Sequence, residues 1–226
     1  MDKACEDLVV SEIVQRCPGD GIVGEEGSQR ESFTGRTWVL DPIDGTTNYV
    51  YNLPHWCVSI GLRDITGPLV GVVSAPALDT TFAAARGQGA WRRTGHGDWQ
   101  RLSVSVTADM DRALIGTGFG YTQSRRSGQA RVLRTVLPKV RDIRRLGSCA
   151  LDMCMVAEGS LDAYFERGVH DWDYAAGELI AVEAGARVTG LRGQGPGETM
   201  VVAGNAMIHG ALVAILEECD ADSDRP

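Results

Sequence analysis

The chain has 226 residues, of which 43% are hydrophobic, enough to bury a sizeable core as one large domain or two small lobes. Its formal charge is −8, from 30 acidic against 22 basic residues, and no basic stripe carries interleaved aromatic residues. The composition argues against a nucleic-acid-binding protein, and no apolar run reaches membrane-spanning length. We therefore expect neither a nucleic acid nor a membrane as a partner.

The six cysteines form no C-x-x-C pair and no cluster with zinc-ligand spacing. No signal-peptide pattern precedes them. We expect reduced, mostly buried thiols and a cytoplasmic protein.

The first half of the chain predicts one helix and then mainly strands. Leu8, Val9 and Ile13 recur at helical spacing and predict a helix over 6–16, which Pro18 and the glycines after it end. Apolar or alternating runs predict strands within 22–28, 32–41, 56–63, 69–76 and 80–93, the third and fourth forming a hairpin.

The second half of the chain alternates between patterns typical of strands and patterns typical of helices. Strands are expected within 113–119, 161–167, 186–190 and 199–204, and helices within 128–140, 146–160, 173–185 and 205–219. Gly185 is expected just after the C-cap of the third of these helices, and the tail 220–226 is expected to fray. We place a weakly marked boundary between lobes near 107–112.

Two carboxylates, Asp41 and Asp44, follow an apolar strand directly and precede Gly45 and Thr46. Each residue alone is typical of a turn or a helix N-cap. Together, however, the carboxylates repel each other unless a cation lies between them. Carboxylate and carbonyl oxygens are the ligands that Mg²⁺ prefers, and the amides of a following helix start can bind phosphate. The stretch therefore predicts a metal beside a phosphate.

Two more acidic groups follow predicted strands, at Glu25 and Glu26 and again at Glu166, Asp171 and Asp173. An acidic turn and an acid that complements a helix dipole are the alternatives. We expect the three strand-to-turn junctions to converge on one end of a layered fold, although spacing alone leaves this open.

The stretches "GEEGS", "WVLDPIDGTTNY" and "WDYAAGELIAVEAGA" resemble the three motifs of the inositol monophosphatase family. "ARGQGAW" and "GSCALDMCMVAEGSLDAYFERGVHDWD" also resemble family stretches, in the family's order and spacing up to about Leu216. The resemblance implies an α/β fold, a layered αβαβα sandwich, forming one compact catalytic unit. Its N-terminal lobe, 1–108, would carry the metal and phosphate motifs, and its C-terminal lobe, 109–226, the substrate pocket and the last metal ligand.

The resemblance also implies a role for each matching residue. Two or three Mg²⁺ ions would be held: the first by Glu25, Asp41 and the carbonyl of Ile43, the second by Asp41, Asp44 and Asp173, and a weaker third by Glu25. Gly45 and Thr46 would bind the phosphate through their amides, and Thr46 with Asp2 would orient and deprotonate the attacking water. Glu166, Ser148 or Cys149, and His170 would line the pocket for the sugar or cyclitol.

The implied activity is Mg²⁺-dependent hydrolysis of a small phosphate monoester by direct attack of water, most closely inositol 1-phosphate. Paired metal ions can stabilise both the attacking and the leaving oxygen, and they lower the pKa of bound water. Histidinol phosphate and fructose 1,6-bisphosphate are alternative substrates. A non-catalytic relative with partners in RNA metabolism is a different class of alternative. A homodimer and inhibition by lithium are expected from the resemblance.

The family's first long helix and the strand after it have no counterpart before Asp2, so we expect the fold to lack that helix. A misassigned start codon and a true truncation are both open. The absent helix would leave apolar surface uncovered, at about 25 cal/mol per Å², with Asp2 on a frayed terminus. We expect impaired stability and activity of this chain.

Overall fold

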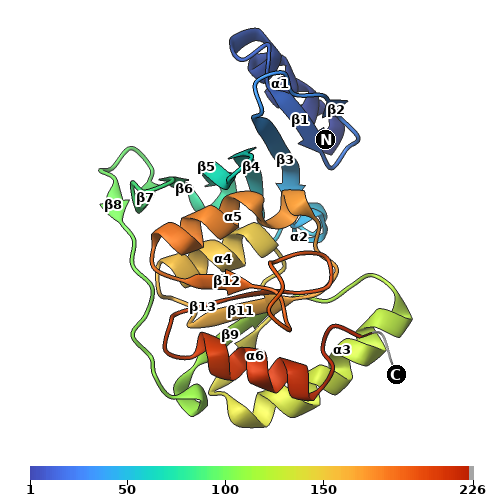
Figure 1. Ribbon diagram of the computed structural model, residues 1–226, viewed down its shortest axis with the longest axis vertical. Coiled ribbons are helices and arrows are strands. Elements are labelled where there is room, and N and C mark those ends of the chain that lie inside the picture. The colour runs from blue at the N-terminus through green and yellow to red at the C-terminus, as the bar shows by residue number, and fades with distance from the viewer. Residues whose placement is uncertain (224–226) are drawn as a thin grey trace.

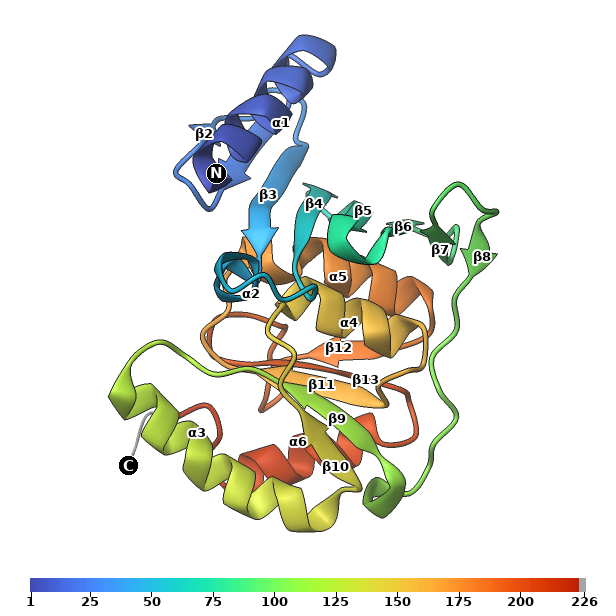
Figure 2. The ribbon, with the colours of Figure 1, turned by 180° about the vertical axis from the view of Figure 1, so that it is seen from behind.

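The computed structural model describes residues 1–223, which form two β-sheets with helices on and between them (Figure 1). The layers follow the order α1, first sheet, α4 with α5, second sheet, and α3 with α6. Figure 2 shows the same stack from behind, with α4 and α5 between the two sheets. The expected αβαβα sandwich is therefore confirmed.

The first sheet contains eight strands in the spatial order β2-β1-β3-β4-β5-β6-β7-β8. Only β1 and β3 are parallel, and the other neighbours are antiparallel. The strands are β1 (Gly21–Gly24), β2 (Gln29–Arg30), β3 (Thr37–Asp44), β4 (Cys57–Asp64), β5 (Gly67–Ala75), β6 (Thr80–Ala85), β7 (Ala90–Thr94) and β8 (Gln100–Arg101). The expected hairpin is the pair β4 and β5.

The second sheet contains five strands in the order β10-β9-β11-β13-β12. Strand β9 pairs in parallel with β10 and β11, and β13 pairs antiparallel with β11 and β12. The strands are β9 (Leu114–Thr117), β10 (Asp142–Arg144), β11 (Ala163–Glu166), β12 (Arg187–Thr189) and β13 (Val201–Gly204). The first sheet ends at Arg101 and the second begins at Leu114, and the division into lobes at 108/109 stays a prediction.

The α-helices of the described chain are α1 (Asp2–Arg16), α2 (Thr46–Val50), α3 (Gln123–Val136), α4 (Cys149–Ala157), α5 (Asp171–Glu183) and α6 (His209–Glu218). Short 3₁₀ turns are η1 (Pro76–Leu78), η2 (Met110–Arg112) and η3 (Leu137–Lys139). No helix within residues 1–223 is long and apolar enough to cross a membrane.

Four buried apolar clusters fill the four gaps between the five layers. Ile13, Ile22 and Leu40 join α1 to the first sheet. The largest cluster lies between that sheet and α4 with α5, and two others lie on the two faces of the second sheet. Each layer therefore buries one or both of its apolar faces, as such sandwiches require.

Helix α5 packs closely against the first sheet because small residues meet there. An added Cβ at Gly61 would lie 3.0 Å from the Ala175 Cβ, and one at Gly71 would lie 2.6 Å from the Ala176 carbonyl oxygen. Glycine on the strands thus permits the close approach. The start of α5, which carries Asp173, is held near β3 as a result.

Several expected boundaries differ from the structure. Helix α1 begins at Asp2 rather than Glu6, so Asp2 lies in its first turn, and Leu8 is exposed because Val9, Val10 and Ile13 face the sheet. Helices α3 and α5 also begin earlier than expected. Gly185 follows the C-cap of α5 at φ +102°, as expected.

The tail is ordered in part. Ala221 is buried, and Asp220 and Asp222 both pair with Arg192, so fraying is wrong for these residues. Residues 224–226 of the expected frayed tail lie outside the described residues.

Candidate metal and phosphate site

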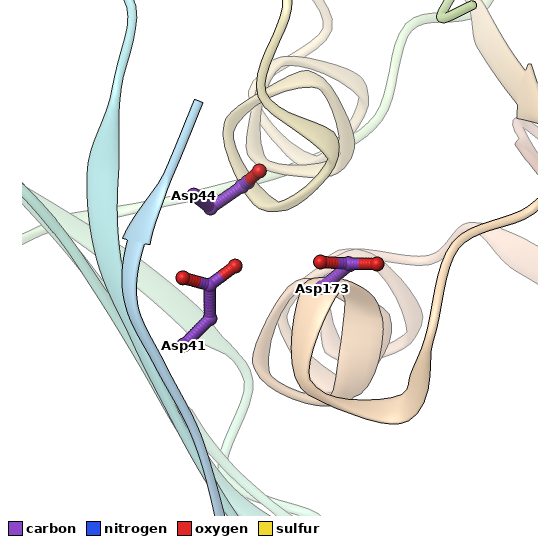
Figure 3. Close-up of side chains that lie close together, drawn as sticks. All are labelled: Asp41, Asp44 and Asp173. Atoms are coloured by element: carbon purple, nitrogen blue, oxygen red, sulfur yellow. The ribbon is translucent and has the colours of Figure 1, made fainter. Parts of the chain in front are cut away.

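Asp41 and Asp44 share one side of β3 because a β-bulge lies between them. Asp41 pairs with Ser59 and Asp44 with Cys57, so two residues of β3 stand opposite one residue of β4. Side chains alternate along a regular strand, and positions three apart would point to opposite faces. The extra residue of the bulge corrects this alternation. Both carboxylates are buried and point toward the helices (Figure 3).

Asp173 completes a cluster of three carboxylates. It occupies the first turn of α5, where its Oδ2 accepts a hydrogen bond of 2.6 Å from the backbone amide of His170. Asp41, Asp44 and Asp173 each offer an oxygen atom within 4.8 Å of the others, from a strand and a helix far apart in the sequence (Figure 3). This group could hold a metal ion, since oxygen ligands at such spacing suit hard divalent cations.

Glu25 joins this cluster from the turn after β1. Its backbone amide donates to the carbonyl of Leu40 at 3.1 Å, and its carboxyl interacts electrostatically with that of Asp41. Burial raises the pKa of Glu25, and the charges of Glu26 and Asp2 add to the effect. The three acidic junctions therefore converge, as the sequence predicted.

The carboxyls of the cluster have raised pKa values because burial disfavours their charged forms and because they repel one another. The pKa of Asp44 and that of Asp173 are each raised from 3.8 to about 7. Burial and then Asp44 raise the pKa of Asp41 well above its usual range. Without a cation the cluster retains protons near neutral pH, and a divalent cation would displace them.

Asp44 is oriented by the start of α4. Its Oδ2 accepts from the Ser148 hydroxyl at 2.6 Å and from the Ala150 amide at 2.7 Å, and its Oδ1 accepts from the Cys149 amide at 3.3 Å. Ser148 also caps α4 by accepting from the Leu151 amide at 3.2 Å. Ser148 is buried and does not line the cavity described below, so it is not where a substrate contact was expected. Its single hydroxyl instead bonds to Asp44 and caps α4.

A sharp turn links the cluster to α2. Gly45 has φ +92°, and an added Cβ would lie 3.0 Å from the His55 carbonyl oxygen and 3.1 Å from that of Gly147, so only glycine fits. The Thr46 hydroxyl donates to the Ile43 carbonyl at 3.0 Å. The turn is thereby fixed beside the carboxylates.

A cavity of about 510 Å³ opens beside the cluster. Its acidic and polar walls include Glu25, Asp44, Gly45, Thr47, Cys149, Glu166, His170 and Asp173, and its other walls include Phe119, Tyr121, Arg145 and Trp172. The expected pocket residues Cys149, Glu166 and His170 therefore lie together. Asp2, Asp41, Ile43 and Thr46 are not among the residues that line this cavity.

Glu166 and Cys149 differ in what they can contribute to the cavity. Burial raises the pKa of Glu166 to about 7, and its Oε2 accepts a hydrogen bond from the Tyr164 hydroxyl. Burial raises the pKa of the Cys149 thiol well above its usual range, so this thiol is not an activated nucleophile. Glu166 thus brings a carboxylate to the cavity, and Cys149 contributes a small side chain to its wall.

Two further charged residues, Asp171 and Arg145, lie in different places. Asp171 lies outside the acidic cluster, and Arg145 lines the cavity. Asp171 turns away from the cluster, and hydrogen bonds from Tyr174 and Arg63 lower its pKa against the opposing effect of burial. Arg145, which belongs to none of the acidic motifs, lines the cavity. Its position two residues before the Gly147 turn was the available signal.

Comparison with known proteins gives a consistent match. The model of the inositol monophosphatase family matches residues 1–221. The inositol-1-monophosphatase SuhB of Mycobacterium tuberculosis is 45% identical over 222 residues, which are 95% of this chain and 76% of that protein. The Nus factor SuhB of Xylella fastidiosa is 36% identical over 225 residues, 96% of this chain and 80% of that protein.

Solved structures agree in fold. Mycobacterium tuberculosis SuhB has a TM-score of 0.87 at 44% identity, covering 98% of this chain and 85% of that chain. The inositol monophosphatase from Anabaena has a TM-score of 0.87 at 35% identity, covering 96% and 86%. These similarities support phosphatase activity, and with the family match they show that the chain belongs to the inositol monophosphatase family.

Proposed function

We propose that this protein is a Mg²⁺-dependent phosphatase that hydrolyses small polyol phosphate monoesters, with inositol 1-phosphate as the leading substrate. The observation that carries the proposal is the convergence of Asp41, Asp44 and Asp173 within 4.8 Å of one another beside a cavity of about 510 Å³. Family membership supports the same reaction class. The site suits Mg²⁺ because every side-chain donor in it is a carboxylate.

The metal ligands in this proposal are Glu25, Asp41, the carbonyl of Ile43, Asp44 and Asp173, which would hold two or three ions. Bound Mg²⁺ would neutralise phosphate charge and lower the pKa of water. The amides of Gly45 and Thr46 would bind the phosphate, since the turn at Gly45 faces the cavity. Thr46 with Asp2 would orient the water, and its hydroxyl already donates to Ile43.

The leaving alcohol would occupy the part of the cavity near Glu166, Cys149 and His170. Glu166 can accept hydrogen bonds from neighbouring hydroxyls, which favours a cyclitol or sugar. We propose that the protein acts in the cytoplasm, consistent with six free thiols in the described chain, and as a homodimer that lithium inhibits.

Arg145 favours fructose 1,6-bisphosphate as a second candidate substrate. Its guanidinium makes no hydrogen bond or ion pair in the described part of the chain, and its Cζ lies 6.0 Å from the centroid of the Phe119 ring. Its charge lowers the pKa of Glu166 against the larger effect of burial. A free guanidinium in the cavity can bind a second phosphate on the leaving alcohol.

A second class of function comes from relatives named Nus factors, which support a regulatory role with partners in RNA metabolism. The intact acidic cluster favours the enzyme. The two classes differ in what Mg²⁺ should do. Binding of RNA or a protein partner that ignores Mg²⁺ and survives Asp173→Asn would favour the regulatory class.

The test is phosphate release from myo-inositol 1-phosphate, histidinol phosphate and fructose 1,6-bisphosphate, each with and without Mg²⁺. Release that requires Mg²⁺ and is fastest from the inositol ester supports the proposal. Absence of release from all three, with folded protein and saturating Mg²⁺, would refute it.

A further inference from the structure

Glu6 is a fully buried carboxylate that binds the turn carrying Glu25. It lies on α1 with no exposed surface. Its Oε2 accepts from the backbone amide of Glu26 at 2.9 Å, and its Oε1 accepts from that of Ser28 at 3.1 Å. One side chain therefore satisfies two amides of the turn between β1 and β2.

Gly24 makes room for the Glu6 carboxylate beside the turn. The carboxylate occupies the space that a side chain at Gly24 would fill, so residue 24 must be glycine for Glu6 to reach the turn. The opposite side of the turn is held by β3, through the bond from the Glu25 amide to the Leu40 carbonyl at 3.1 Å. The turn that carries Glu25 is therefore held by hydrogen bonds to α1 and to β3.

Burial of the Glu6 carboxylate costs free energy unless hydrogen bonds or a cation compensate for it. No ion pair in the described part of the chain involves Glu6, and its charge adds to the repulsion felt by Glu25. Burial of a carboxylate without a cation is unfavourable. Two charge-assisted hydrogen bonds offset part of that cost, and a divalent cation at Glu25 would offset more.

We propose that Glu6 is a positioning residue for the metal ligand Glu25. It fixes the backbone on which Glu25 stands and adds negative charge behind the cation. The inference rests on the metal role of Glu25 in the proposed function. Groups that orient metal ligands in this way typically contribute about 10- to 100-fold to metal affinity.

The test compares Mg²⁺ affinity, measured by titration calorimetry on the whole chain, in the wild type and in Glu6→Gln. The amide keeps the shape of the side chain but turns one acceptor into a donor facing a backbone N–H. We expect Mg²⁺ to bind about 10-fold more weakly. Asp7→Asn is the matched control, because Asp7 is the next residue on α1, is exposed and pairs with Lys3. It should leave the affinity unchanged.

A second variant removes the contact without removing the charge. Gly24→Ala places a Cβ where the Glu6 carboxylate lies and should weaken Mg²⁺ binding to a similar extent. The double variant should be no weaker than either single variant, because both break one interaction. Additive losses would contradict the proposal.

Hydrogen exchange of the metal-free wild type tests the clamp without relying on any variant. We expect the amides of Glu26 and Ser28 to be protected, and to lose protection in Glu6→Gln while core amides of β3 keep it. Fast exchange of both amides in the folded wild type would overturn the inference. If the wild type binds no Mg²⁺, the proposed function fails; if it binds Mg²⁺ and Glu6→Gln binds it equally, only this inference fails.

Discussion

The hydroxyl of Ser148 lies 2.6 Å from Oδ2 of Asp44, and the same hydroxyl caps α4 through the Leu151 amide. The side chains come from the two halves of the chain, 104 residues apart. This bond is one of three that fix the start of α4 to Asp44, the others coming from the Cys149 and Ala150 amides. Loss of this bond should affect both metal binding and stability.

Ser148→Ala is expected to weaken Mg²⁺ binding by about 10-fold, because Asp44 loses a partner that orients it. It should also lower the free energy of unfolding by about 1 kcal/mol through loss of the helix cap. Titration calorimetry and denaturant unfolding measure the two effects. Ser148→Thr retains the hydroxyl and should recover most of both, and an equal loss in Ser148→Thr would contradict the assigned role.

Asp173→Asn should abolish Mg²⁺ binding at the cluster and phosphate release with it. It should also raise the melting temperature of the metal-free protein at about pH 8, since it removes one of three mutually repelling carboxylates, two of them buried. Calorimetric titration and thermal unfolding without metal check the two parts. Asp171→Asn is the control, because Asp171 lies on the same helix but binds Arg63 and Tyr174. A variant that binds Mg²⁺ normally would disprove the ligand assignment.

The metal-free protein should lose stability as the pH rises through neutrality. The pKa values of Asp44 and Asp173 are raised from 3.8 to about 7 by burial, so the folded state holds protons that the unfolded state has released. This stabilising contribution is complete below about pH 4 and is lost as the pH rises through about 7. Melting temperatures between about pH 5 and pH 8 should therefore fall without metal.

Saturating Mg²⁺ should reverse that trend, because protons compete with the cation for the same carboxylates. The increase in melting temperature on adding Mg²⁺ should be larger at about pH 8 than at about pH 6. Carboxyls whose pKa is lowered, such as Asp20, are already ionised over this range and do not mask the effect. A Mg²⁺ effect independent of pH would argue against a shared, proton-retaining cluster.

Arg145→Gln should discriminate between substrates. We expect kcat/KM for fructose 1,6-bisphosphate to fall about 10-fold, mainly through KM, because a charge-assisted hydrogen bond contributes about 1.5–3 kcal/mol. The value for inositol 1-phosphate should change little. Arg144→Gln is the matched control, since Arg144 is exposed and pairs with Asp142. Equal losses on both substrates would instead place Arg145 against the transferred phosphate.

The sequence by itself determined which kinds of chemical groups form the site and which family the protein resembles. Carboxylates after apolar strands, a turn at Gly45, and the helix that carries Asp173 all follow from local pattern. Such features depend on residues near one another in the chain, so they can be inferred from periodicity and turn chemistry. The layered order of sheets and helices came from the family resemblance.

The tertiary structure alone decided how these groups face one another. The bulge that turns Asp41 and Asp44 to one side exists only through the pairing of β3 with β4. Contacts across 104 residues assign Ser148 to Asp44 rather than to the cavity, and contacts between α1 and the β1–β2 turn bury Glu6. Burial and long-range hydrogen bonds depend on which elements pack together, and no local spacing encodes that packing.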